Sequence, residues 1–496
     1  MANLKQKTVH GFFWAILERF GTQAVTFVVS MVLARLLTPS DYGAVALLSI
    51  FIIIAETLSD AGFGGALVQK KNAAAIDFNT VFCISMSVAM ALYAVLFFSA
   101  PWISAYFKHP ELAGLFRVQA LSLFFHSFAG VQGAEMSRRM LFKLSFRISI
   151  ATSIVSSVVG VCCAFAGLGP WALVWMSFSG AVVGLVIRLF VLEWRPRIEF
   201  SLSSAKGLWQ YGWKITLSGL LDTAYNNLYG FLIGRFYSSA DLAFVNKGRS
   251  IPSLAMSSIN GTIGRVAFPA LTQLQDERLR LREAMRRMMQ ISTFIVFPMM
   301  AGLAVCAPSL VPLLFGDQWG ASVIYVQLAC VDLALYPFHT INLQGIKAIG
   351  RSDWFLYLEI AKKFLGVTLV VASIRYGVFA MMFMSACVGG PLCVLINAWP
   401  NRKLLSYPVW MQIRDVFPSA CISLLMAALI FQLNRFPLAD WQTLAVQIPV
   451  GAAVYALAAW LFRLKPYCEA VRLLSPVLEH VSGFNGRIRL GKNVKY

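Results

Sequence analysis

Charged residues are scarce in this chain, and acidic residues are the scarcest. Only 13% of the 496 residues are Asp, Glu, Lys or Arg, whereas 58% are hydrophobic. A soluble domain is closer to half apolar and a quarter charged, so this composition excludes an ordinary soluble protein. Together with a mean hydropathy of +0.70, it predicts an all-α polytopic membrane protein.

The chain also lacks the motifs of nucleotide, metal and hydrolase chemistry. It has no GxxxxGK[ST], HExxH or GxSxG sequence, and its nine cysteines show no CxxC or zinc-site spacing. Its five histidines are scattered along the chain. We therefore predict no cofactor, no metal site and no catalytic residue, and we expect any energy source to be an ion gradient.

The excess of basic residues does not indicate a nucleic-acid partner. The formal net charge is +20, but the basic residues fall in short loops between apolar runs, with no nucleic-acid-binding module around them. Loops of this kind set the orientation of membrane helices instead.

The apolar runs are long enough to cross a bilayer, at about 20 residues for each helix. We predict fourteen transmembrane helices, at approximately 11–35, 42–65, 77–99, 112–134, 145–167, 170–192, 209–236, 241–270, 289–315, 320–346, 354–375, 377–398, 413–433 and 443–462.

Basic residues alternate between the two sides of this arrangement. With the N-terminus in the cytoplasm, nearly all basic loops are cytoplasmic, and the opposite loops hold essentially Lys108, Arg375 and Arg435. This asymmetry is the positive-inside pattern, and it predicts that both termini are cytoplasmic.

A weak internal repeat appears when the chain is shifted by 200 residues. The shift places Arg35 over Arg235 and Asp41 over Asp241, within VLARLLTPSDYGAV and FLIGRFYSSADLAFV. We predict two parallel six-helix halves around a central cavity, two additional helices and a basic cytoplasmic tail. Their limits are 1–200, 201–400, 401–465 and 466–496.

Acidic side chains inside the apolar runs are candidates for ion coupling. Glu56 and Asp60 are four residues apart, so they share one helix face. Glu18 and Asp332 also lie within apolar runs. Ionisable groups in such places often serve transport. Pairing with a basic residue of a neighbouring helix is the structural alternative for each.

Basic side chains inside the runs are candidates for binding an anionic cargo. Each charge near the centre of a membrane helix costs about 3 kcal/mol, so it must face water or other protein groups. Lys247 and Arg249 lie two positions apart, about 200° around a helix, so only one faces a given cavity. Arg19 and Lys214 complete the set, although Lys214 could instead extend to the membrane surface.

Two polar residues on the run 209–236 are candidates for contacting sugar hydroxyls. Asp222 and Asn226 are four residues apart and share a face. Hydrogen bonding between helices is the alternative for both.

Four segments resemble Wzx-type polysaccharide flippases of the multidrug/oligosaccharidyl-lipid/polysaccharide exporter superfamily. They are VLARLLTPSDYGAVALL (32–48), GFGGALVQK (62–70), GPWALV (169–174) and IGRVAFPALTQL (263–274). The resemblance covers most of the chain and is least clear after about residue 400. It is greatest to the branch that includes exporters of colanic-acid-type exopolysaccharide.

This resemblance implies a flippase of the bacterial inner membrane. The implied cargo is an undecaprenyl-pyrophosphate-linked oligosaccharide, moved by alternating access and coupled to a proton or sodium gradient. The implied partners are this cargo, membrane lipids, the coupling ion and other membrane proteins of polysaccharide assembly. A small-molecule or drug exporter of the same superfamily is the alternative. A polysaccharide polymerase would be expected to carry a large outer loop, and we predict none here.

Overall fold

The computed structural model describes residues 2–60, 62–70 and 72–467, without the side chains of 2–13, 16, 211, 258, 260–266, 268–270 and 352. In this part the chain is helical and contains no β-strand, which confirms the all-α prediction. The tail predicted over 466–496 lies outside the described residues from 468 onward.

The helices follow the predicted apolar runs closely. Their bounds are α1 (Ala2–Leu36), α2 (Pro39–Asp60), α3 (Phe63–Gln69), α4 (Ala75–Tyr106), α5 (Leu112–Ala120), α6 (Ser122–Arg138), α7 (Phe142–Phe165), α8 (Trp171–Val191), α9 (Leu202–Phe236), α10 (Ser239–Thr272), α11 (Arg278–Phe315), α12 (Val323–Ala334), α13 (Tyr336–Ala348), α14 (Ser352–Ser373), α15 (Val378–Phe383), α16 (Gly390–Leu404), α17 (Val409–Phe431) and α18 (Asp440–Leu461). Short 3₁₀ segments η1 (Asp317–Ser322), η2 (Ile374–Tyr376) and η4 (Gln432–Arg435) and a π-helical segment η3 (Met384–Gly389) connect them.

Ten segments of the described chain are long and apolar enough to cross a membrane. They are Pro39–Gln69, Ala75–Tyr106, Leu112–Arg138, Phe142–Phe165, Trp171–Val191, Arg278–Phe315, Asp317–Ala348, Val378–Leu404, Val409–Arg435 and Asp440–Leu461. The long helices α1, α9, α10 and α14 would bring the number to fourteen, in agreement with the predicted count. Three of these four, α1, α9 and α10, carry most of the charged candidates.

The chain divides into two compact units. Unit 1 comprises Met1–Lys247, Leu314–Ser322 and Ile374–Val378, and unit 2 comprises Gly248–Leu313, Val323–Ser373 and Phe379–Tyr496. Because the division follows packing, it does not test the sequence repeat, and the predicted limits of the two halves stay a prediction.

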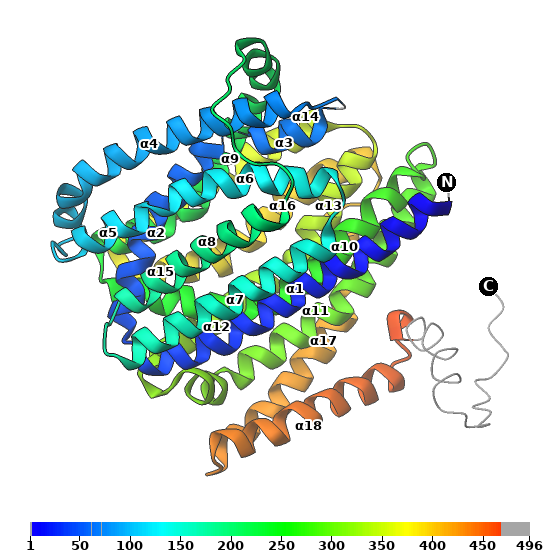
Figure 1. Ribbon diagram of the computed structural model, residues 1–496. Helices are drawn as coiled ribbons and strands as arrows, with labels where there is room; N and C mark the ends of the chain where they lie inside the picture. The colour runs from blue at the N-terminus through cyan, green and yellow to red at the C-terminus, as the bar shows by residue number, and fades with distance from the viewer. Residues whose placement is uncertain (1, 61, 71, 468–496) are drawn as a thin grey trace, which may run out of the picture. The chain divides into compact units, whose positions relative to one another are not determined.

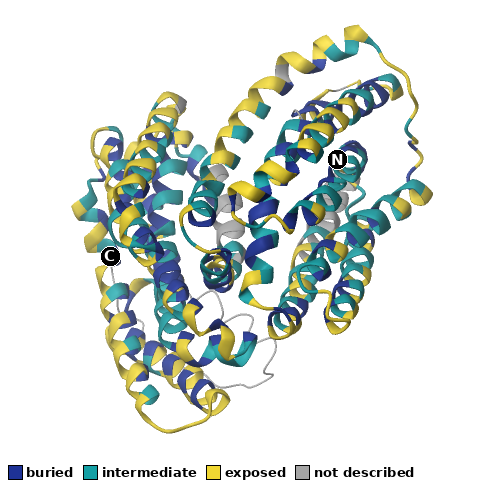
Figure 2. Ribbon diagram, turned by 90° about the vertical axis from the view of Figure 1, so that its left-hand side faces the viewer, coloured by how far each residue is buried: buried dark blue, intermediate teal, exposed yellow. Residues whose placement is uncertain are grey.

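Unit 1 is built on packed pairs of helices, some consecutive and some distant in sequence. Helix α1 lies along α7, which lies along α8 (Figure 1), and α2 packs along α9. The main core cluster joins α2, α4, α5, α6 and α8 around Leu48, Phe116 and Leu123, each at most 1% exposed. Buried and exposed positions alternate along the helices (Figure 2), so each helix presents one face to its neighbours.

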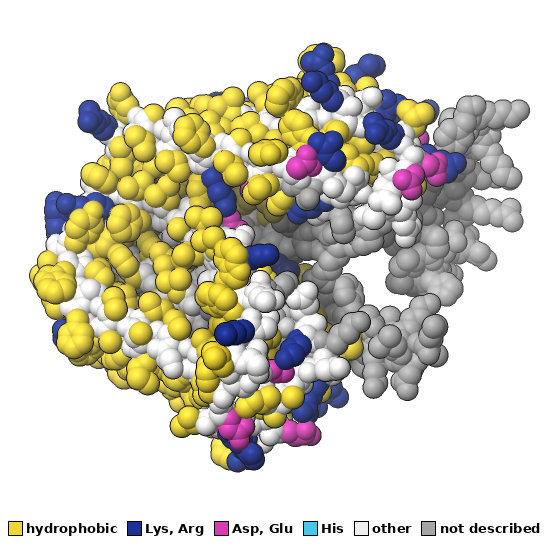
Figure 3. All heavy atoms as spheres, turned by 90° about the horizontal axis from the view of Figure 1, so that it is seen from above, with side chains coloured by type: hydrophobic (Ala, Val, Ile, Leu, Met, Phe, Trp, Pro, Cys, Tyr) yellow, Lys and Arg dark blue, Asp and Glu magenta, His cyan; other side chains and the backbone are white. Residues whose placement is uncertain are grey.

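The outward faces are apolar as well, which is the reverse of a soluble bundle. Phe98, Trp102 and Phe190 of unit 1 are 71%, 76% and 80% exposed. Hydrophobic side chains cover much of the face seen in Figure 3. Exposed apolar area of this extent requires a hydrocarbon surrounding, and the protein is therefore a multi-pass membrane protein.

Unit 2 is held by an apolar cluster and a buried amide network. Helix α13 packs along α16, and α17 along α18. The fully buried side chains of Asn342, Asn401 and Gln412 bond to one another. Nearby, Arg286 donates two hydrogen bonds, of 2.8 and 2.7 Å, to the carboxylate of Asp415. Most of these polar groups are thus paired within the unit, as low-polarity surroundings require, while Asn401 Oδ1 is buried without a hydrogen-bond partner among the described residues.

The two segments aligned by the 200-residue shift have the same local geometry. Asp41 accepts hydrogen bonds from the backbone NH and hydroxyl of Thr38, at 2.9 and 2.7 Å. Asp241 accepts the corresponding bonds from Ser238, at 3.2 and 2.6 Å. Each pair supplies partners for otherwise unpaired groups at the start of a helix.

The 200-residue shift also relates two helix contacts near these turns, that of α2 with α9 and that of α1 with α10. A Cβ added to Gly234 would lie 1.9 Å from Leu47, so α2 and α9 approach closely at this point. Lys247, which is 200 residues after Leu47, instead reaches Ser30 of α1 with its ammonium group. The α1–α10 contact is therefore a polar counterpart of the apolar α2–α9 contact.

We expect Gly43→Ala to destabilise the protein. A Cβ at residue 43 would lie 1.8 Å from the carbonyl oxygen of Ser239, which belongs to the backbone and cannot rotate away. Overpacking of this kind costs about 1–3 kcal/mol. Thermal unfolding in detergent, followed by tryptophan fluorescence, measures the loss.

Gly133→Ala is the matched control, because no atom lies within 4 Å of its added Cβ. Replacing a helical glycine by alanine in open space is neutral or stabilises by up to about 1 kcal/mol. Equal melting temperatures for the two variants would contradict the close approach at Gly43.

Candidate functional site

A polar cavity of about 350 Å³ lies within unit 1. Helices α2, α5, α6 and α8 form its walls, and apolar side chains such as Ile52 and Phe178 line part of it. Its polar lining consists of Ser49, Glu56, Gln119, Ser122, His126, Ser177 and Arg188. A carboxylate, an imidazole and a guanidinium therefore share one cavity among apolar helices.

Glu56 lines the cavity wall and accepts one hydrogen bond there. The hydroxyl of Ser122 donates a hydrogen bond of 3.2 Å to its Oε1. The amide of Gln119 donates to Ser49 Oγ at 2.9 Å, while Gln119 Oε1 is enclosed without a hydrogen-bond partner among the described residues. These groups suit a hydrated cavity, because water or a small ion can satisfy such oxygens.

Arg188 connects this cavity with a second carboxylate. Its Nε is enclosed and has no hydrogen-bond partner in the described part of the chain, while the guanidinium interacts electrostatically with Glu18 of α1. Glu18 in turn accepts hydrogen bonds from Ser145 and Ser149 of α7, at 2.9 and 2.6 Å. Of the predicted coupling residues, Glu18 thus interacts with Arg188, and Glu56 lines the cavity that Arg188 also lines.

Asp60 lies on the same side of α2 as Glu56, as their spacing predicts. Its Oδ1 would be 3.2 Å from a Cβ added to Gly64 and 3.4 Å from one added to Gly130 of α6. The two glycines leave room for the carboxylate in a closely packed region.

Four predicted cargo residues lie at exposed positions in unit 1. Arg19, Lys214, Asp222 and Asn226 are all exposed, and Lys214 Nζ is 6.0 Å from the ring centre of Trp213. The structure does not place these four in the polar cavity.

Lys247 occupies a different environment, with only 7% of its surface exposed. Its Nζ lies 4.5 Å from the ring centres of Tyr42 and Phe315 and 5.4 Å from that of Trp319. It also donates hydrogen bonds to the carbonyl and hydroxyl of Ser30, at 3.2 and 3.1 Å. Cation–π contacts in dry surroundings contribute about 2 kcal/mol or more, so the ammonium is firmly held in this aromatic cage.

Arg249 and Asp332 form an ion pair in unit 2. The sequence assigned Arg249 to the cargo and Asp332 to the coupling ion, and the structure brings them to 3.4 Å. Both remain accessible, since their side chains are 45% and 30% exposed. The π-helical segment η3 packs against α12, which carries Asp332, and π-helical turns occur frequently at functional sites.

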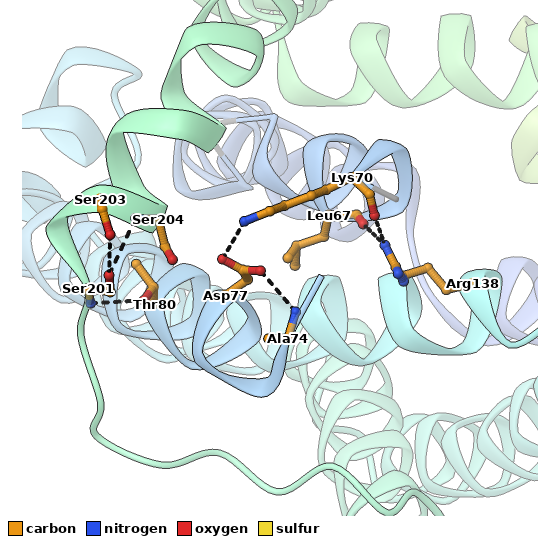
Figure 4. Close-up of polar contacts among 9 residues, drawn as sticks. All are labelled: Leu67, Lys70, Ala74, Asp77, Thr80, Arg138, Ser201, Ser203 and Ser204. Carbon is orange, nitrogen blue, oxygen red and sulfur yellow. Dashed lines mark hydrogen bonds and ion pairs between the residues drawn. The ribbon is translucent and has the colours of Figure 1, made fainter. Parts of the chain in front are cut away.

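A further polar cluster joins α3, α4, α6 and the start of α9, and Figure 4 shows it. Lys70 and Asp77 form an ion pair of 2.8 Å. Arg138 donates hydrogen bonds to the carbonyl of Leu67, in the last turn of α3, and to that of Lys70, the residue that follows α3. Thr80 accepts a hydrogen bond from the backbone NH of Ser201. These groups pair within the cluster, so we assign it a structural role.

No three His, Cys, Asp or Glu side chains of the described residues gather closely enough to hold a metal ion.

Comparison with known proteins identifies the family. The sequence profile of polysaccharide biosynthesis proteins matches residues 32–324, which is more than half of the chain. The chain belongs to this family. The match confirms the resemblance seen in the sequence, while the colanic-acid branch stays a prediction.

Individual relatives of this polysaccharide biosynthesis protein are distant but cover most of the chain. It is 24% identical to the lipopolysaccharide biosynthesis protein WzxC of Escherichia coli, over 74% of this chain and 75% of the relative. It is also 24% identical to the succinoglycan biosynthesis transport protein ExoT of Rhizobium meliloti, over 89% of each chain.

Among solved structures, the fold is similar to that of the lipid II flippase MurJ in an inward closed conformation. The TM-score is 0.72, with 12% identity, over 90% of this chain and 98% of MurJ. At this identity the likeness shows the fold alone.

Three residues of the cavity were not among the site residues predicted from the sequence, namely Arg188, His126 and Gln119. Arg188 lies near the end of one apolar run, and His126 interrupts another. A polar residue within an apolar run was the available signal, but only the packing of α2 against α5, α6 and α8 brings these side chains into the cavity that Glu56 lines.

We expect the cavity to be hydrated, and cysteine labelling can test this. In a variant without the nine native cysteines, Ala181→Cys places a thiol on the cavity wall. Only the thiolate reacts, and it forms far more readily where water reaches it. Labelling by a small methanethiosulfonate should be at least about tenfold faster than for Ala89→Cys, because Ala89 is fully buried in the core cluster. Equal rates would contradict a hydrated cavity.

Proposed function

We propose that this protein is a flippase for undecaprenyl-pyrophosphate-linked oligosaccharides in the bacterial inner membrane. Membership of the polysaccharide biosynthesis family carries the proposal. The likeness of the fold to a lipid flippase is consistent with it. The cargo moves from the inner to the outer leaflet by alternating access, and both termini are cytoplasmic.

The cargo pyrophosphate is assigned to Arg249. A guanidinium binds phosphate oxygens through two parallel hydrogen bonds, and this side chain is nearly half exposed beside Asp332. An arriving phosphate would displace Asp332 from Arg249. Lys214, Asp222, Asn226 and Arg19 lie at exposed positions, where they can contact the pyrophosphate and the sugar as the cargo passes.

Ion coupling is assigned to the carboxylates, chiefly Glu56. This group lines a polar cavity that Arg188 also lines, and Arg188 interacts electrostatically with Glu18. Binding of H⁺ or Na⁺ would neutralise Glu56 and so change the charge inside the cavity that Arg188 also lines. Asp60, on the same side of α2, and Asp332, beside Arg249, complete the coupling set.

Transport of this kind changes no covalent bond, so the protein is not an enzyme in this proposal. A drug exporter of the same superfamily is the alternative. Deletion of the gene distinguishes the two, because a flippase mutant loses surface polysaccharide and keeps its resistance to cationic drugs.

Arg249→Ala should reduce surface polysaccharide at least about tenfold at an unchanged membrane level of the protein, since it removes the phosphate ligand. Arg249→Lys keeps the charge but not the planar fork, so it should retain an intermediate level. Quantification of surface polysaccharide in a strain without its own flippase gives the measurement. Arg280→Ala is the control, because this exposed side chain pairs only with nearby Glu277 in the described structure. Normal export by Arg249→Ala would refute the cargo assignment.

Glu56→Gln should uncouple flipping from the ion gradient, because the amide can still accept a bond from Ser122 but cannot ionise. In proteoliposomes an imposed pH or sodium gradient should accelerate flipping by the unmodified protein and by Glu283→Gln, an exposed control. The same gradient should leave Glu56→Gln at its basal rate. If neither gradient changes flipping by the unmodified protein, facilitated diffusion describes the transport better.

A further inference from the structure

The aromatic cage of Lys247 is assembled from segments far apart in the sequence. Ser30 belongs to α1, Tyr42 to α2, Lys247 to α10, Phe315 to the end of α11 and Trp319 to η1. Burying an ammonium group in apolar surroundings is costly unless other groups replace its water. Here the three ring faces and the two oxygens of Ser30 do so.

The segment η1 fastens the end of α1 beside the cage. Trp319 is fully buried, and its Nε1 donates a hydrogen bond of 2.8 Å to the carbonyl of Ala34. Gln318 donates to the carbonyls of Ala34 and Leu37, at 2.6 and 3.2 Å. Carbonyls at a helix C-terminus have no partner within their own helix, so these side chains satisfy groups that would otherwise need water.

The beginnings of α2 and α10 also touch at this end. The hydroxyls of Ser40 and Ser239 are 3.4 Å apart, and only a residue without a side chain at position 43 allows the backbones to approach this closely. Ser239 is 4% exposed. Under the predicted topology, this end of the helices is the outer one.

We propose that the Lys247 cage and the Ser40–Ser239 contact form a latch, which closes the outer end of the helices and opens once in each transport cycle. The proposal rests on the proposed function for its role in flipping. It assigns Lys247 to gating and not to contact with the cargo.

A lysine suits a contact that must both close and open. In the closed latch the ammonium is stabilised by rings and by Ser30, and in the open latch by water. A leucine, as at the repeat-related position Leu47, would expose apolar surface on opening and gain nothing in return. The difference between Leu47 and Lys247 therefore makes the α1–α10 contact reversible and leaves the α2–α9 contact permanent.

Cross-linking can test the latch. In the variant without native cysteines, Ser40→Cys with Ser239→Cys is oxidised, or joined by a short bis-methanethiosulfonate where oxidation is incomplete. Mass spectrometry measures the cross-linked fraction. We expect flipping of lipid-linked oligosaccharide in proteoliposomes to fall in proportion to that fraction and to return on reduction.

The matched control is Ser59→Cys with Ser127→Cys, whose parent hydroxyls are 3.0 Å apart between α2 and α6 of the same predicted half. This cross-link should leave flipping within about twofold of the reduced protein. Undiminished flipping with Ser40 and Ser239 fully linked would overturn the latch.

A second measurement does not depend on the cargo. Ser239→Cys alone should be labelled by a membrane-impermeant thiol reagent, because opening exposes it, whereas the fully buried Ser59→Cys should not be. Lys247→Met should slow the labelling of Ser239→Cys at least about tenfold, because an apolar side chain favours the closed state. Labelling without flipping of any lipid-linked oligosaccharide would refute the proposed function and leave the latch standing. Labelling of Ser239→Cys that is no faster than that of Ser59→Cys would overturn the latch.

Discussion

A charge within an apolar membrane helix must be kept away from lipid, and the polar architecture of this protein follows from that constraint. The charged groups within the helices are accommodated in different ways. Glu18 is bound by serine hydroxyls, Glu56 faces a polar cavity, and Lys247 is enclosed by aromatic rings. Arg249 and Asp332 neutralise each other.

The segments aligned by the 200-residue shift meet this constraint differently. The turns at Asp41 and Asp241 have the same hydrogen bonds, so the two segments begin their helices in the same way. The residues that follow then diverge, with Leu47 packed against Gly234 and Lys247 bonded to Ser30. Two copies of one helix pair therefore have different chemistry at the same position. Such a difference allows one contact to be permanent while the other opens, without any change of fold.

Much of the fold could be predicted from the sequence because membrane helices need long apolar runs and satisfied backbones. The helix α10 occupies Ser239–Thr272, close to the predicted 241–270. Angular relations along one helix were also predictable. Lys247 and Arg249 enter different surroundings, and Glu56 and Asp60 face the same side, as their spacing requires. The partners were not predictable, because periodicity gives the face of a helix and not the neighbour that covers it. Arg188 near Glu18 and Trp319 over Lys247 are the clearest examples.

The sequence by itself determined the class of protein, the helices and the family, because hydropathy, spacing and short motifs act locally along the chain. Only the tertiary structure decided which charges meet. It joined Arg249 to Asp332 over 83 positions and brought Lys247 to Ser30 over 217. It also formed the cavity at Glu56 from four helices. The physical reason is that a buried ion is stabilised by whatever packs around it in three dimensions, and a single helix does not contain that information.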